Sequence, residues 1–155
     1  MMEYSTYGRH VAVDAWGVHF DHLNAADLLC KQMVQAAEAS GATILSVQSK
    51  QFEPQGATVL LLLSESHMSI HTYPEKGFAA LDCYTCGESV DPQIAIQAML
   101  DFLQPNSTSQ ASLSRGMGAL HVRISNEADV VSEAALEVDA SDAAADASDA
   151  AKFRM

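Results

Sequence analysis

Residues 60–75 read LLLLSESHMSIHTYPE, in which a run of four leucines passes directly into polar and ionisable side chains. The leucines are typical of a buried strand, and the alternation of residue types from His67 to Thr72 predicts a second strand beside it. An ionisable side chain next to a buried strand costs free energy unless it is paired or used in chemistry. The pattern alone leaves two interpretations open: a buried strand that ends in a polar turn, or an active site.

Strand and helix patterns continue on both sides of this stretch. Asn24 resembles the N-cap of a helix that Ser40-Gly41 closes, and Asp91-Pro92 opens a second helix that Pro105 ends. Apolar residues recur at helical spacing in both. Strands are predicted at residues 9–16, 42–48, 57–63, 67–72, 78–84 and 119–124, with residues 57–63 buried on both faces and residues 106–114 as a polar loop.

This order of elements predicts an α+β fold. We expect a two-layer α/β sandwich, with helices on one face of a mainly antiparallel sheet. Each predicted helix has one apolar stripe and can cover only one side of the sheet. The other sheet face is therefore expected to find a partner.

Length and composition predict one folded domain followed by a tail. At 155 residues the chain can bury a sizeable core of its own. After Ile124 the composition shifts to Ala, Asp and Ser, and residues 127–155 hold eight acids and two bases, half of the formal net charge of −12. We predict a domain over residues 1–125 and an acidic low-complexity tail over residues 126–155, disordered because it cannot bury an apolar face.

Composition also disfavours several classes of function. The chain lacks the basic surface that nucleic-acid binding needs. No apolar run reaches the length of a membrane helix, and the first residues show no signal-peptide pattern, so a cytoplasmic location is predicted. The cysteines, Cys30, Cys83 and Cys86, are too few and odd in number for a disulfide framework, and no metal site is predicted.

Several short segments match a known family. They are Gly8-Arg9-His10, KQFEPQG at residues 50–56, LSESHMSIHTYPE at residues 63–75, YTCG at residues 84–87 and RGMG at residues 115–118. On these segments the chain resembles the bacterial and archaeal S-adenosylmethionine decarboxylases, which are pyruvoyl-dependent enzymes made as proenzymes. The resemblance runs from about residue 8 to residue 124 and leaves the tail outside.

In this family the electron sink that decarboxylation needs is made from the chain itself. The resemblance implies that the hydroxyl of Ser66 attacks the carbonyl of Glu65 and forms an ester. Elimination then separates residues 1–65 from residues 66–155 and leaves dehydroalanine at position 66. The dehydroalanine takes up water and loses ammonia to become a pyruvoyl group. The substrate amine condenses with this group as a Schiff base.

The resemblance assigns further roles in processing and catalysis. His71 is the base for self-cleavage, Thr58 supports it with a hydroxyl where the family often has serine, and Cys86 donates a proton to the substrate carbon. An imidazole titrates near neutral pH, and an ordinary thiol still holds its proton there. Read without the family, His71 could be a satisfied polar residue on a strand. Cys83-x-x-Cys86 could be a redox or zinc motif, although it lacks a second ligand pair, and Cys83 fits a core residue.

Substrate binding is implied at two further positions. Phe52 would stack on adenine and attract the sulfonium, and Glu75 would accept hydrogen bonds from both ribose hydroxyls. Each has an alternative, since Phe52 could be a core residue and Glu75 could form a solvated pair with Lys76.

The activity implied is the decarboxylation of S-adenosylmethionine to S-adenosylmethioninamine, the aminopropyl donor for spermidine. The family also implies a homodimer with shared sites, which would cover the open sheet face in a four-layer stack. One alternative is a pyruvoyl-dependent arginine or ornithine decarboxylase on the same scaffold. Another is a regulatory homologue that never processes, against which the intact Glu65-Ser66 pair, His71 and Cys86 argue.

Overall fold

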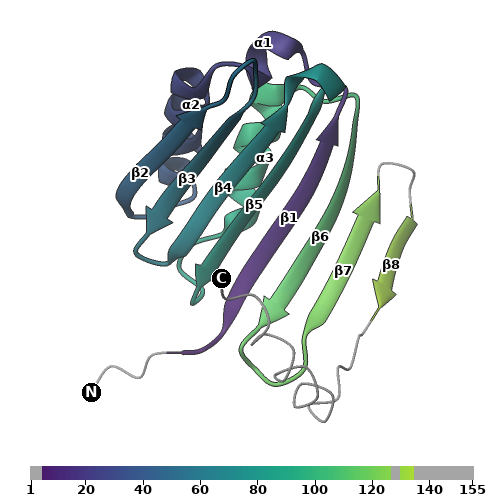
Figure 1. Ribbon diagram of the computed structural model, residues 1–155. Helices are drawn as coiled ribbons and strands as arrows, with labels where there is room; N and C mark the ends of the chain where they lie inside the picture. Colours follow the sequence, from purple (N-terminus) through teal and green to yellow (C-terminus); the bar gives the residue numbers. More distant parts are fainter. Residues whose placement is uncertain (1–4, 127–129, 135–155) are drawn as a thin grey trace, which may run out of the picture.

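The structure is a computed structural model that describes residues 5–126 and 130–134 (Figure 1). Its strands form one antiparallel sheet in the order β2-β3-β4-β5-β1-β6-β7-β8. The elements are β1 (Gly8–Trp16), α1 (Phe20–Leu23), α2 (Ala26–Ala39), β2 (Ile44–Gln51), β3 (Ala57–Leu63), β4 (Ser66–Tyr73), the short 3-10 helix η1 (Pro74–Lys76), β5 (Phe78–Cys86), α3 (Pro92–Leu103), β6 (Ser107–Arg115), β7 (His121–Asn126) and β8 (Val130–Ala134).

The helices lie behind one face of this sheet, and the other face is open in Figure 1. The core between the layers takes alternate residues from the strands and one stripe from each long helix, including Leu29 and Met33 of α2 and Ile96 and Met99 of α3. This confirms the predicted α+β class and the two-layer arrangement. None of the helices in the described part of the chain has the length and hydropathy needed to cross a bilayer.

The predicted ends of the second long helix are confirmed. The Asp91 side chain accepts a hydrogen bond from the backbone N–H of Gln93 at 3.0 Å, and Pro92 occupies the first turn. Proline suits that position because the first N–H groups of a helix have no intrahelical partner. Gln104 then turns left-handed ahead of Pro105, which ends the helix.

The predicted N-cap role of Asn24 is wrong. Ala25 occupies the N-cap of α2, and Asn24 instead ends the short helix α1. Its side-chain oxygen accepts hydrogen bonds from the backbone N–H of Gly56 and from Gln51, at 2.9 and 3.0 Å. A preference for capping could not reveal this contact, because the partners lie at the end of β2 and on the loop after it, distant in sequence from Asn24.

The prediction that β3 is buried on both faces is also wrong. Val59 and Leu61 are fully buried against the helix layer, whereas Leu60 and Leu62 are 48% and 53% exposed on the open face. The composition correctly indicated an apolar surface on both sides, but this chain supplies a covering layer for only one. The leucines of the open face are consistent with the predicted partner.

The polar stretch predicted as a loop is a strand instead. β6 pairs with β1 along its whole length, from Trp16–Ser107 to Gly8–Arg115. The unpaired edge of β1 offers backbone donors and acceptors that a neighbouring strand satisfies whatever its side chains. The sheet continues through β7 to β8, which lies within the segment predicted as the tail. Residues 127–129 and 135–155 of the predicted tail lie outside the described residues.

Candidate active site

Strand alternation separates the side chains of β4 into two sets. Met68, Ile70 and Thr72 are buried under the helices, while His67 and His71 lie on the open face. The candidate functional side chains therefore gather on or beside the face that no helix covers. They form two groups, one at each end of β4.

The first group, which we call the cleavage end, consists of Glu65, Ser66 and Cys86. Ser66 has a backbone φ of 147°, a conformation that L-residues rarely adopt and that stores strain. The carbonyl oxygen of Glu65 accepts a hydrogen bond from the backbone N–H of Cys86 at 2.8 Å. The carboxylate of Glu65 accepts one from the N–H of Thr43 at 3.0 Å. The peptide bond between Glu65 and Ser66 thus has its carbonyl group fixed by a hydrogen bond, and the backbone of the residue that follows it, Ser66, is strained.

The two cysteines of β5 occupy different environments. Cys83 is buried in the core, and this burial, with the charges of Asp82 and Asp91, raises its pKa to about 12. Cys86 is exposed at the end of the strand, beside the Glu65 carbonyl. Residues three apart on a strand face opposite sides of the sheet, so the pair cannot bind one metal or form one disulfide there. The Cys-x-x-Cys interpretation is therefore not supported.

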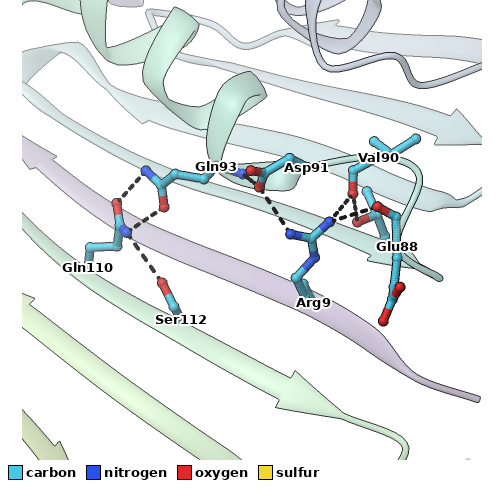
Figure 2. A network of polar contacts seen from close by, with 8 residues as sticks. Arg9, Glu88, Val90, Asp91, Gln93, Gln110 and Ser112 are labelled. Carbon is cyan, nitrogen blue, oxygen red and sulfur yellow. Dashed lines mark hydrogen bonds and ion pairs between the residues drawn. The ribbon is translucent and has the colours of Figure 1, made fainter.

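The loop after Cys86 is held from the helix side by Arg9 (Figure 2). Its guanidinium donates to the backbone carbonyls of Val90 at 2.7 Å and Glu88 at 3.4 Å, and lies 3.7 Å from the carboxylate of Asp91. Next to this group, the side chains of Gln93 and Gln110 hydrogen-bond each other. Arg9 thereby ties β1 to the loop that follows the end of β5 and to the start of α3.

The second group, the His71 end, consists of Phe52, Thr58, His71 and Glu75. Thr58 is paired with His71 across β3 and β4, and their side chains hydrogen-bond at 2.5 Å. The Phe52 ring lies 6.0 Å from the His71 ring, edge to face. Glu75, in η1 just after β4, is exposed and accepts a hydrogen bond from Gln55 at 3.3 Å.

The two groups do not meet within one chain. His71 follows Ser66 by five residues on the same strand, which corresponds to about 16 Å. Between the ends, the open face has a depression of about 490 Å³. His71, Ser69 and Asp82 are among the residues that line it, together with three alanines of β1, β5 and β6.

Sequence reasoning missed a third cluster, which adjoins the cleavage end. His67 of β4 and His10 of β1 both pair with Tyr84 of the intervening strand β5, so the three residues form one row. Asp82 accepts hydrogen bonds from His10 at 2.7 Å, from His67 at 3.1 Å, and from Ser69. Alternation indicates that each residue faces this side, but only the strand order shows that they are neighbours.

The cluster has an anionic centre. Burial alone would raise the pKa of Asp82, but the hydrogen bonds from Ser69, His10 and His67 outweigh it and hold the pKa below its usual value. The two imidazoles and the carboxylate lie within 4.8 Å of one another, a spacing that could hold a metal ion. However, the guanidinium of Arg115 lies 3.2 Å from His10, and its positive charge disfavours a cation there. We interpret these groups as hydrogen-bond partners.

At one position in each of two matching segments, glycine is required because a side chain would collide with its neighbours. A side chain at Gly8 would approach the Tyr84 ring to 2.6 Å. Gly116 has a φ of 86°, and a side chain there would collide with the backbone of Thr6. Gly8 leaves room for Tyr84 in the row of rings, and Gly116 allows the chain to turn directly after Arg115.

Comparison with known proteins identifies the family. The model of the S-adenosylmethionine decarboxylase family matches residues 9–116. The chain belongs to this family. It is 70% identical over 121 residues to an S-adenosylmethionine decarboxylase proenzyme of Brevibacillus brevis, covering 78% of this chain and 91% of the relative. It is 56% identical to S-adenosylmethionine decarboxylase proenzyme 2 of Bacillus cereus, covering 77% and 97%.

A solved structure supports the same assignment. The crystal structure of the adenosylmethionine decarboxylase of Aquifex aeolicus superposes with a TM-score of 0.69 at 34% identity, over 73% of this chain and 93% of that chain. Family membership confirms the resemblance on which the predicted residue roles rest. The roles themselves remain predictions.

Proposed function

We propose that the chain cleaves itself between Glu65 and Ser66 and then decarboxylates S-adenosylmethionine to S-adenosylmethioninamine for spermidine synthesis. The observation that carries the proposal is the strained Ser66, which follows a carbonyl held by the N–H of Cys86. The similar proteins of Brevibacillus and Bacillus are named proenzymes, in agreement with self-cleavage. A cytoplasmic location is part of the proposal.

The cleavage end has the groups that self-cleavage requires. Attack of the Ser66 hydroxyl on the Glu65 carbonyl carbon places negative charge on the carbonyl oxygen. The N–H of Cys86 already donates to that oxygen at 2.8 Å, and a donor fixed in advance where charge develops lowers the barrier. Rearrangement of the amide to an ester, followed by elimination, would release the strain at Ser66.

The pyruvoyl group that this reaction would leave at position 66 supplies the electron sink for decarboxylation. The residues around the site fit such a group. Cys86 is exposed beside the Glu65 carbonyl, so its thiol is in a position to carry a proton to the substrate carbon. The hydrogen bonds from Arg9 to the loop that follows Cys86 hold this end of β5 in place.

We propose that the complete site forms between two copies of the chain. His71 and Thr58 lie about 16 Å along the sheet from Ser66, too far to act on it in the same chain. Leu60 and Leu62 leave apolar surface exposed on the same face. Packing two open faces together would bury these leucines and bring the His71 end of one copy to the cleavage end of the other, in the predicted four-layer dimer.

The substrate assignment depends on the His71 end. The Phe52 ring is exposed at the end of β2 and can stack on adenine, which contributes about 1–3 kcal/mol per base in comparable nucleic-acid contacts. The exposed carboxylate of Glu75 can accept the ribose hydroxyls. Arginine and ornithine offer neither group, so these residues favour the nucleoside substrate.

Two measurements test the proposal. The mass spectrum of the purified protein should show two fragments, residues 1–65 and residues 66–155, and a pyruvoyl group should block the N-terminus of the second. The Ser66→Ala chain should stay whole. Release of labelled carbon dioxide should then be compared for S-adenosylmethionine, arginine and ornithine. A full-length active enzyme would contradict the cleavage, and release from arginine or ornithine alone would contradict the substrate.

A further inference from the structure

We propose that His67 is the base that takes the proton from the Ser66 hydroxyl in the first step of self-cleavage, and that Asp82, His10 and Arg115 position it. This inference rests on the proposed function and names the group that starts it. It assigns a separate step to His71, which the family resemblance links to the elimination that follows ester formation.

The contact between the two groups is direct. The Nδ1 atom of His67 lies 3.2 Å from the Oγ atom of Ser66, within hydrogen-bonding distance. His71, by contrast, is about 16 Å away along the strand. His67 is therefore the imidazole that this chain itself places against the attacking hydroxyl.

The hydrogen bonds around Asp82 determine which nitrogen of His67 is free. Arg115 can only donate, and its Nη1 atom lies 3.2 Å from Nδ1 of His10, so that nitrogen must accept. The proton of a neutral His10 is then on Nε2, which donates to Asp82 at 2.7 Å. Arg115 also stacks on the Tyr84 ring, 4.4 Å from its centroid, which restrains the guanidinium.

The same reasoning applies to His67. The anionic Asp82 carboxylate can only accept, so Nε2 of His67, at 3.1 Å, must donate to it. A neutral His67 then has an unshared electron pair on Nδ1, which faces the Ser66 hydroxyl. The charged and titratable groups around the imidazole are Asp82, His10 and Tyr84, with Arg115 behind His10. Asp82 stabilises the imidazolium that forms when the proton moves.

The proposed step is a balanced isomerisation. His67 takes the Oγ proton as the Oγ–C bond to Glu65 forms, and the carbonyl oxygen becomes an anion held by the N–H of Cys86. The C–N bond then breaks, and the imidazolium returns its proton to the departing nitrogen of Ser66. An amide becomes an ester with no net change in protons or electrons and no co-reactant.

The test isolates this first step in a His71→Ala background, where the ester is expected to accumulate. Hydroxylamine cleaves esters and leaves amides intact, so the rate of hydroxylamine-dependent cleavage at position 65 reports ester formation. His67→Ala should slow it by about 10²-fold or more, the typical contribution of a general base. His121→Ala, an exposed strand histidine outside the cluster, is the matched control and should have no effect.

Rescue by a small molecule separates a chemical role from a structural one. Added imidazole should restore ester formation to the His67→Ala chain, because it can occupy the space of the lost ring. It should not restore the Asp82→Asn chain, in which the base is present but no longer held in the required tautomer. Rescue of both variants, or of neither, would contradict the assigned roles.

The outcomes distinguish this inference from the proposed function. If the wild-type chain never cleaves, the proposed function fails. If it cleaves, but the His67→Ala chain forms the ester at the rate of its parent, only the inference fails. A wild-type chain that cleaves while His71→Ala forms no ester would also overturn it, since His71 would then be needed for the first step.

Discussion

The two ends of the open sheet face are built differently. At the cleavage end, hydrogen bonds within one chain surround the reacting groups: Cys86 holds the Glu65 carbonyl, and Asp82 holds His67 against Ser66. At the His71 end, Phe52 and Glu75 are exposed and make few contacts with the described residues. One end is assembled in a single chain, and the other presents groups that a ligand or a second chain can contact.

We infer that each chain carries two half-sites. The strained Ser66 and the groups that surround it can start the reaction, but His71 and the substrate-binding residues act on another copy. This division can be tested at each end separately, and the four predictions below run from the largest expected effect to the smallest.

Mixing two inactive chains should restore cleavage. Homodimers of Ser66→Ala should not cleave, and homodimers of His71→Ala should not form the pyruvoyl group. When both chains are co-expressed, one site of the mixed dimer pairs an intact Ser66 with an intact His71. The His71→Ala chain should then yield the blocked fragment of residues 66–155, detected by mass. Failure of that chain to cleave in the mixture would place both groups in one protomer.

The two cysteines of β5 should respond very differently to replacement. Cys86→Ala should still cleave, because the backbone N–H at position 86 remains, but its decarboxylation should fall by about 10²–10⁴-fold through loss of the proton donor. Cys83→Ala should keep activity and lose only packing. Alkylation of the native protein at pH 8 should label Cys86 and spare Cys83, whose burial raises its pKa to about 12. Equal catalytic losses at both positions would contradict these roles.

Replacing the binding residues should affect the substrate and not self-cleavage. Phe52→Ala should raise KM for S-adenosylmethionine by about 5- to 150-fold, which corresponds to a lost stacking contact of about 1–3 kcal/mol. Glu75→Gln should raise KM less, because the amide keeps one acceptor. Both variants should yield the same fragments as wild type. Slow cleavage in either would indicate that the His71 end was distorted rather than deprived of a contact.

The smallest effect concerns stability, and it tests the anionic centre of the third cluster. The pKa of Asp82 is lowered in the fold from its ordinary value of 3.8, so the carboxylate stabilises the native chain above that pH. This stabilisation is lost as the pH falls through the lowered value. In a Ser66→Ala chain, Asp82→Asn should lower the free energy of unfolding by about 1–3 kcal/mol at pH 7, measured in urea, and by less at pH 3. A difference independent of pH would show that the charge contributes nothing.

Local pattern was enough to predict the elements whose ends depend on neighbouring residues. Asp91 and Pro92 begin α3 through a cap and a first-turn proline, and Gly87 directly follows β5. Asn24 and residues 106–114 were predicted wrongly for the opposite reason, since their partners are distant in sequence. The exposure of one face of β3 was also not predictable from local pattern, because it depends on which face of the sheet the helices cover.

The sequence by itself determined the family, the Glu65-Ser66 pair with its associated motifs, and the two-residue period that places His67 and His71 on one side of β4. Only the tertiary structure decided that β1 lies between β5 and β6, and that His10 and Arg115 therefore stand behind Asp82 and His67. The physical reason is that strands pair through backbone groups common to nearly every residue, so the strand order depends on how the whole chain packs. No local pattern could reveal this cluster.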